Sequence, residues 1–174
     1  MFGFSSKDDR LVKITRKAAS RLTELSIRSR PEADRASVEV AANLALLSVA
    51  IDILNQSGNY TLIDKLVDKL PRSIPDKVVN LNWALPNENA RLAASKMIYG
   101  AHATNVLGAF EAIYNTRIHE DLKMIDERQS GPMDRLGGMA SVVSEYLFPP
   151  EQTPPFTDVL KEVSEYAMTV TKFG

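Results

Sequence analysis

The amino-acid sequence predicts an all-α protein, a single-domain bundle of about five to seven helices. Apolar residues recur at the three- and four-residue steps of a helix, and no stretch alternates in polarity for long enough to predict a strand. A nearly fully apolar run over about 36–57 is typical of a helix buried at the centre of such a bundle. With 174 residues, 44% of them apolar and 25% charged, the chain has the size and composition of one globular domain.

Residues 1–30 are expected to form a basic amphipathic helix, which begins near Lys7 and ends before Pro31, because the residue that precedes a proline disfavours helical geometry. One narrow face is apolar and consists of Leu11, Ile14, Ala18, Leu22 and Leu25. The adjacent flank is basic, is partly neutralised by Glu24, and consists of Arg10, Lys13, Lys17, Arg21 and Arg28. Eight Lys/Arg and three Asp/Glu give this region a charge of +5, so the remainder of a chain with net charge −1 is acidic.

The core of the bundle is expected within residues 31–148, around the apolar helix over about 36–57, which Gly58 ends. Asp52 is an unusual residue on this helix because its neighbours on the same face are apolar. A buried carboxylate must be paired or hydrogen-bonded, since an isolated buried charge is very costly. Two roles for Asp52 remain open: a structural carboxylate bound by a cation or a backbone amide, or a contact to a partner or ligand in a groove.

Three further helices are expected in the core, over 62–70, about 87–128 and 139–148. Pro71 is expected to end the first of them, and prolines punctuate 71–86, where a short helical turn is expected over 76–83. One face of the long helix carries only small residues, which would allow a second helix, within the chain or in a homodimer, to approach closely. These residues are Ala101, Thr104, Gly108 and Ala112.

Glycine and proline also predict two breaks between helices. The pairs Gly131-Pro132 and Gly137-Gly138 indicate a loop over 129–138. Four prolines within 149–155 indicate a stiff, extended spacer before an amphipathic C-terminal helix within 156–174. This last helix either packs against its own chain or docks on a neighbouring subunit or partner.

No residue cluster predicts catalysis, a cofactor site or a metal site. The chain has no cysteine, no glycine-rich phosphate loop and only two histidines, His102 and His119. Neither histidine completes the Glu-x-x-His pattern of di-iron bundles, because Tyr99 and Thr116 stand three residues before them. Tyr99, His102 and Asn105 are the candidates for a small-molecule site or an enzyme, which is kept as an alternative.

The expected function is therefore that of a non-enzymatic protein–protein interaction module, such as an adaptor, a chaperone-like factor or an assembly subunit. Its expected partner is an acidic protein, because the basic flank is the most distinctive surface. The pI near 6.1 argues against a dedicated nucleic-acid-binding protein. The expected partner-binding residues are Arg10, Lys13, Lys17, Arg21, Arg28, Phe156, Leu160 and Val163.

A cytoplasmic location is expected, because the N-terminus lacks the features of a secretory signal and the apolar run contains charged residues. The second alternative is a peripheral membrane protein, in which Phe2 and Phe4 insert into an anionic membrane beside the basic helix.

Overall fold

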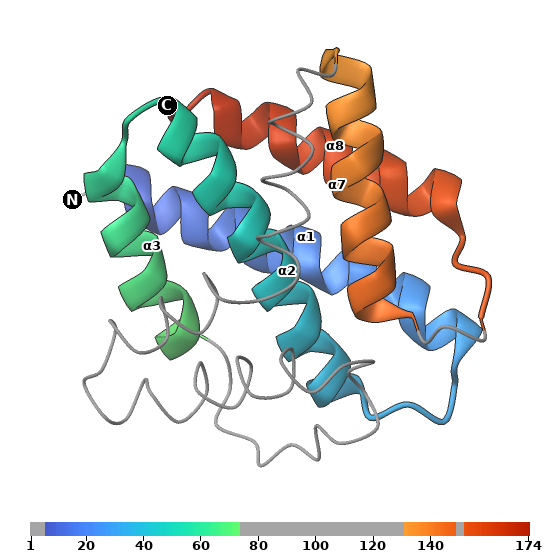
Figure 1. Cartoon of the computed structure of the whole chain (residues 1–174). Helices are drawn as coiled ribbons and strands as arrows, with labels where there is room; N and C mark the ends of the chain where they lie inside the picture. The colour runs from blue at the N-terminus through green and yellow to red at the C-terminus, as the bar shows by residue number, and fades with distance from the viewer. Residues whose placement is uncertain (1–5, 74–130, 149–151) are drawn as a thin grey trace.

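The computed structural model describes residues 6–73, 131–148 and 152–174 (Figure 1). This part of the chain contains five helices and no strand, which confirms the all-α class. The helices are α1 (Lys7–Ser29), α2 (Arg35–Gln56), α3 (Tyr60–Ser73), α7 (Pro132–Leu147) and α8 (Phe156–Thr171). The expected turn over 76–83 and the long helix over about 87–128 lie outside the described residues.

Helix α1 begins and ends almost where its sequence predicts. Ser6 is the N-cap, and its side-chain oxygen accepts a hydrogen bond from the backbone N–H of Asp9 at 3.3 Å. Asp8 and Asp9 lie in the first turn, where negative charge interacts favourably with the helix dipole. Arg30 is the C-cap, so the helix ends one residue earlier than expected.

Helix α2 lies at the centre of the described part of the fold, because it contacts each of the four other helices described (Figure 1). Its residues 40–52 are buried without interruption. The segment Val38–Gln56 is long and apolar enough to cross a membrane by length and composition, but 83% of its most apolar window is buried inside the protein. The apolar sequence is thus matched by contacts with other helices, as a helix that is apolar on every side requires.

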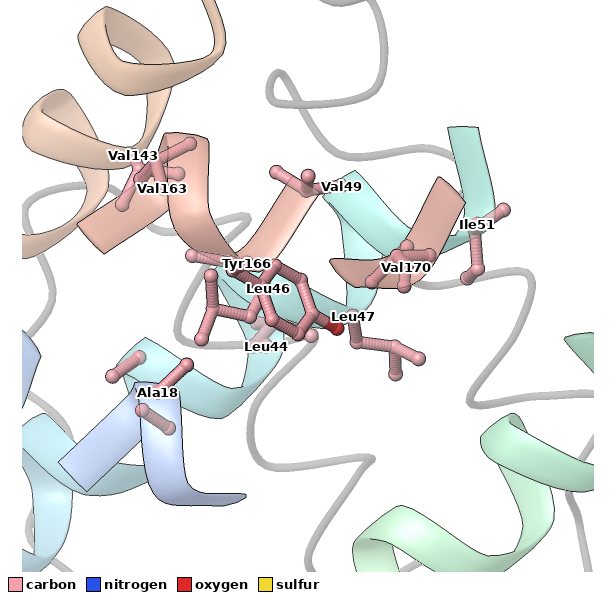
Figure 2. Packing of buried hydrophobic residues seen from close by; sticks show 14 of the residues in the cluster. Ala18, Leu44, Leu46, Leu47, Val49, Ile51, Val143, Val163, Tyr166 and Val170 are labelled. Carbon is pink, nitrogen blue, oxygen red and sulfur yellow. The ribbon is translucent and has the colours of Figure 1, made fainter. Parts of the chain in front are cut away.

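Helix α8 packs against α1, α2 and α7 of its own chain. Figure 2 shows Tyr166 of α8 close to the segment of α2 that contains Leu46 and Leu47. The Tyr166 hydroxyl shares a buried hydrogen bond of 2.9 Å with the Thr15 hydroxyl of α1. Burial raises the pKa of Tyr166 well above its ordinary value, so this hydroxyl stays protonated. The C-terminal helix is therefore part of the core in this structure.

Helix α3 continues beyond Pro71, where the sequence predicted its end, and reaches Ser73. A proline in the last turn removes a single helical hydrogen bond, and contacts at the end of the helix offset the loss. Arg16 of α1 donates a hydrogen bond to the backbone carbonyl oxygen of Ser73, and the Ser73 hydroxyl donates to the carbonyl oxygen of Leu70 at 2.6 Å. A contact with α1 thus holds the final turn, and no local sequence pattern could indicate it.

Helix α7 begins at Pro132, so the expected loop over 129–138 is wrong from that residue onward. Gly131 is the N-cap with extended backbone, and Pro132 occupies the start of the helix, where a missing N–H removes no helical hydrogen bond. Gly137 and Gly138 lie in the helix interior, where each costs about 1 kcal/mol relative to alanine. Packing of α7 against α2 and α8 offsets that cost.

A prediction follows for Gly137 and Gly58, which have similar free space around them but different backbone conformations. A Cβ atom at Gly137 meets no atom within 4 Å, so Gly137→Ala should raise the free energy of unfolding by about 0.5–1 kcal/mol in urea denaturation. Gly58 has a positive φ of 70°, so Gly58→Ala should lower the same quantity although its Cβ also meets open space. Destabilisation by Gly137→Ala would contradict the helical assignment at this position.

Candidate functional site

Three cations of α1 are exposed at helical spacing. Arg10, Lys13 and Lys17 are three and four positions apart and lie outside the buried face that contains Leu11 and Leu22. None of the three forms a salt bridge with another described residue. The guanidinium carbon of Arg10 lies 5.7 Å from the centre of the Phe173 ring, a cation–π contact at the end of α8. We call these three residues the cationic row.

The two remaining cations of the predicted basic flank differ from the cationic row. Arg21 forms a salt bridge with Glu162 of α8. Arg28 is exposed and lies near Glu24, whose pKa is lowered mainly by its hydrogen bond to Arg35 and, to a smaller degree, by the charge of Arg28. The structure thus divides the flank into an exposed row at the N-terminal half of α1 and a partly matched C-terminal half.

The three predicted contact residues of the C-terminal helix differ in their exposure. Phe156 is exposed, Leu160 is half-buried against the core, and Val163 is fully buried (Figure 2). A contact between Val163 and a partner would require α8 to leave the core, so the expectation that Val163 is presented at the surface does not fit this arrangement. Phe156 is the first residue of α8, a helix about 24 Å long, and Phe173, which contacts Arg10, lies beyond its other end, so Phe156 is remote from the cationic row.

Two carboxylates at the start of α1 are held by a lysine of α3. The Lys69 ammonium lies 2.5 Å from a carboxylate oxygen of Asp8 and 2.6 Å from one of Asp9. Hydrogen bonds from Lys69 and then Ser6 lower the pKa of Asp8 to about 2, and the same two groups lower the pKa of Asp9. Lys69 therefore compensates part of the negative charge that stands next to the cationic row.

Asp52 is bound by a cation, as one of its two predicted roles requires. Its Oδ2 atom lies 2.7 Å from Nη2 of Arg135 on α7 and accepts a hydrogen bond of 3.4 Å from the side-chain amide of Gln56. Arg135 also donates to the side-chain oxygen of Gln56. We call these three residues the Asp52 cluster. Sequence reasoning did not identify Arg135 as the cation, because it placed this residue in a loop.

A cavity of about 510 Å³ lies beside the Asp52 cluster, between the C-terminal end of α2, the first turns of α7 and the last turns of α8. Its lining residues are Ile53, Gln56, Ser57, Arg135, Leu136, Met139, Ala167, Met168 and Thr171. No pattern in the sequence indicated this cavity, because it arises only where three helices that are distant in sequence meet.

Other candidates from the sequence lie outside the described residues. These are Phe2, Phe4, Tyr99, His102, Asn105 and His119. Within the part that the structure describes, no group of three or more His, Cys, Asp or Glu side chains is arranged to hold a metal ion.

Comparison of the chain with models of protein families, with curated proteins and with solved structures finds no match.

The contacts of Lys69 predict a pH dependence of stability. Because the pKa of Asp8 is lower in the folded protein than its ordinary value of 3.8, the unfolded chain binds more protons near pH 3 and stability rises with pH there. This contribution is complete above about pH 4 and is lost as the pH falls toward 2. Lys69→Met should therefore lower the free energy of unfolding at neutral pH, and the difference from the wild type should shrink between pH 4 and 2.

NMR titration of the Asp8 carboxyl group checks the cause of this effect, and the pKa should be higher in Lys69→Met than in the wild type, because the largest cause of its lowering is removed. Lys65→Met is the matched control, because Lys65 is exposed on the same helix and forms no salt bridge within the described part of the chain. An unchanged Asp8 pKa in Lys69→Met would contradict the assignment.

Proposed function

We propose that the protein is a non-enzymatic interaction module that binds an acidic protein partner through the cationic row of α1. The observation that carries the proposal is the contrast among the cations of this helix. Arg16 and Arg21 are engaged by Glu39 and Glu162 of the same chain, whereas Arg10, Lys13 and Lys17 are exposed and form no salt bridge with the described residues. The row is thus available to carboxylates of another molecule.

The spacing of the row favours joint action of its charges. Arg10 and Lys17 are seven positions apart, which is about 10 Å along a helix, and Lys13 lies between them. This length is comparable with the Debye length of about 8 Å at physiological ionic strength, so the three charges attract an anionic surface together. The remainder of the chain is acidic, so the field of the protein orients an acidic partner toward α1.

The position of α1 also supports a binding role. Leu11 and Leu22 are fully buried, and the hydrogen bond between Thr15 and Tyr166 joins the inner face of the helix to α8. A row of cations on a helix that is already fixed needs no further ordering of the backbone when a partner binds, and this lowers the entropic cost of association. Such a surface suits an adaptor or an assembly subunit.

The proposal predicts that charge reversal in the cationic row weakens partner binding. Tagged protein is used to capture partners from nuclease-treated lysate, and the affinity of a purified partner is then measured. Lys13→Glu/Lys17→Glu should weaken this affinity at least tenfold, because two attractive contacts become repulsive. Added salt should weaken binding to the wild type, since exposed charges are screened.

The matched control is Lys65→Glu/Lys161→Glu, which makes the same change in net charge at exposed lysines of α3 and α8. An equal loss of affinity in both double variants would contradict a role for the cationic row, as would an unchanged affinity in Lys13→Glu/Lys17→Glu. Vesicles of phosphatidylcholine with and without phosphatidylserine provide the second arm. If the wild type binds anionic vesicles and only Lys13→Glu/Lys17→Glu loses this binding, the partner of the cationic row is a membrane surface and not an acidic protein.

A further inference from the structure

Arg10 differs from the two lysines of the cationic row because an aromatic ring lies against its charged group. Its guanidinium carbon is 5.7 Å from the centre of the Phe173 ring, within the distance of about 6 Å at which the face of a ring attracts a cation. In the described part of the chain, the side chains of Lys13 and Lys17 form no hydrogen bond, salt bridge or ring contact. Within the cationic row, such a contact thus positions Arg10 alone.

Phe173 is itself held in place by its surroundings. Its side chain is only 7% exposed and belongs to the apolar core. Its backbone N–H donates a hydrogen bond of 2.8 Å to the carbonyl oxygen of Val170. Its own carbonyl oxygen accepts one of 2.9 Å from the side-chain amide of Asn59, which lies between α2 and α3. The ring is therefore a fixed support for Arg10.

The guanidinium group of Arg10 keeps its hydrogen-bond donors for another molecule. Arg10 is exposed, and its side chain forms no hydrogen bond or salt bridge with a described residue. The ring of Phe173 attracts the charge but supplies no oxygen acceptor to the N–H groups. A guanidinium presents paired N–H donors that match the two oxygens of a carboxylate, whereas a lysine ammonium acts as a point charge.

We infer that Arg10 is the specificity-determining residue of the cationic row, which binds a carboxylate of the partner through paired N–H donors, and that Phe173 is its positioning residue. Fixing a long side chain costs rotamer entropy, and the contact with Phe173 provides part of this order before the partner binds. Lys13 and Lys17 attract the partner, and Arg10 orients it. The inference rests on the proposed function, because it concerns the same surface and the same acidic partner.

The first test measures the contact between Arg10 and Phe173 and needs no partner. An aromatic ring changes the chemical shift of groups close to its face, so the ¹⁵N-labelled Nε–Hε signal of Arg10 should move in Phe173→Leu. This change keeps an apolar side chain in the core but removes the ring. The matched control is the Nε–Hε signal of Arg28, which is exposed near the other end of α1 and should not move. Arg10→Lys assigns the Arg10 signal by its loss. An unchanged Arg10 signal in Phe173→Leu would overturn the positioning role.

The second test measures the affinity for a peptide of ten glutamates with both ends blocked, which is the probe for an acidic partner. Arg10→Lys keeps the charge but removes the paired donors, so it should weaken binding by about two- to tenfold, the worth of one hydrogen bond. Lys13→Arg is the matched control and should not weaken binding.

The positioning role is tested with the same peptide in a double-mutant cycle. Phe173→Leu should weaken binding by about two- to fivefold, because the loss of positioning cannot exceed the worth of an exposed cation–π contact. The same change made in Arg10→Gln should have no further effect, since the guanidinium is already absent. Equal weakening in both backgrounds would show a general structural effect and would overturn the positioning role. Circular dichroism checks that each variant keeps the helical content of the wild type.

The outcomes separate this inference from the proposed function. If Lys13→Glu/Lys17→Glu weakens peptide binding but Arg10→Lys does not, the specificity role of Arg10 is overturned and the proposed function stands. If peptide binding is unchanged in Lys13→Glu/Lys17→Glu, the proposed function is contradicted, whatever the variants of Arg10 and Phe173 show.

Discussion

The burial of α2 is the constraint on which the rest of the structure depends. A helix that is apolar on every side has no face to offer to water, so other helices must cover it around its circumference. In the described part of the chain α1, α3, α7 and α8 all contact α2, and its residues 40–52 are buried without a break. Each of these four helices packs against α2. The cationic row and the cavity are both consequences of this arrangement, one on an outer face and one at a junction.

Periodicity and end signals predicted α1, α2 and α8 closely, because the pattern of apolar and polar residues within each of these helices indicates which of its faces are buried. The predicted helix ends were wrong where contacts between residues far apart in sequence determine them. Pro71 does not end α3, since Arg16 from another helix holds the final turn, and Gly137 does not break α7, since packing against α2 and α8 outweighs its weak helix propensity. Propensity is a local quantity, whereas these two helices depend on interactions between residues far apart in sequence.

The same distinction applies to the candidate sites. The sequence indicated the five-residue basic flank that contains the cationic row, because residues that share a face of one helix follow from spacing alone. It could not indicate that Arg21 is engaged by Glu162 or that Val163 is a core residue, since both facts depend on how α8 packs. Asp52 shows an intermediate case. Its apolar neighbours indicated that Asp52 needs a partner. That this partner is Arg135, and that a cavity lies beside it, depends on where α7 begins.

The central claim is that α1 is a fixed helix whose inner side belongs to the α2 core and whose outer side carries the binding charges. Native-state hydrogen exchange tests it most directly, because it gives the free energy of opening at each amide. The account predicts that the amides of α2 over 40–52 and those around Leu11, Thr15 and Leu22 of α1 exchange only through global unfolding. Exchange of the α1 amides at a much lower free energy than those of α2 would contradict it, since the cationic row would then stand on a helix that opens independently of the core.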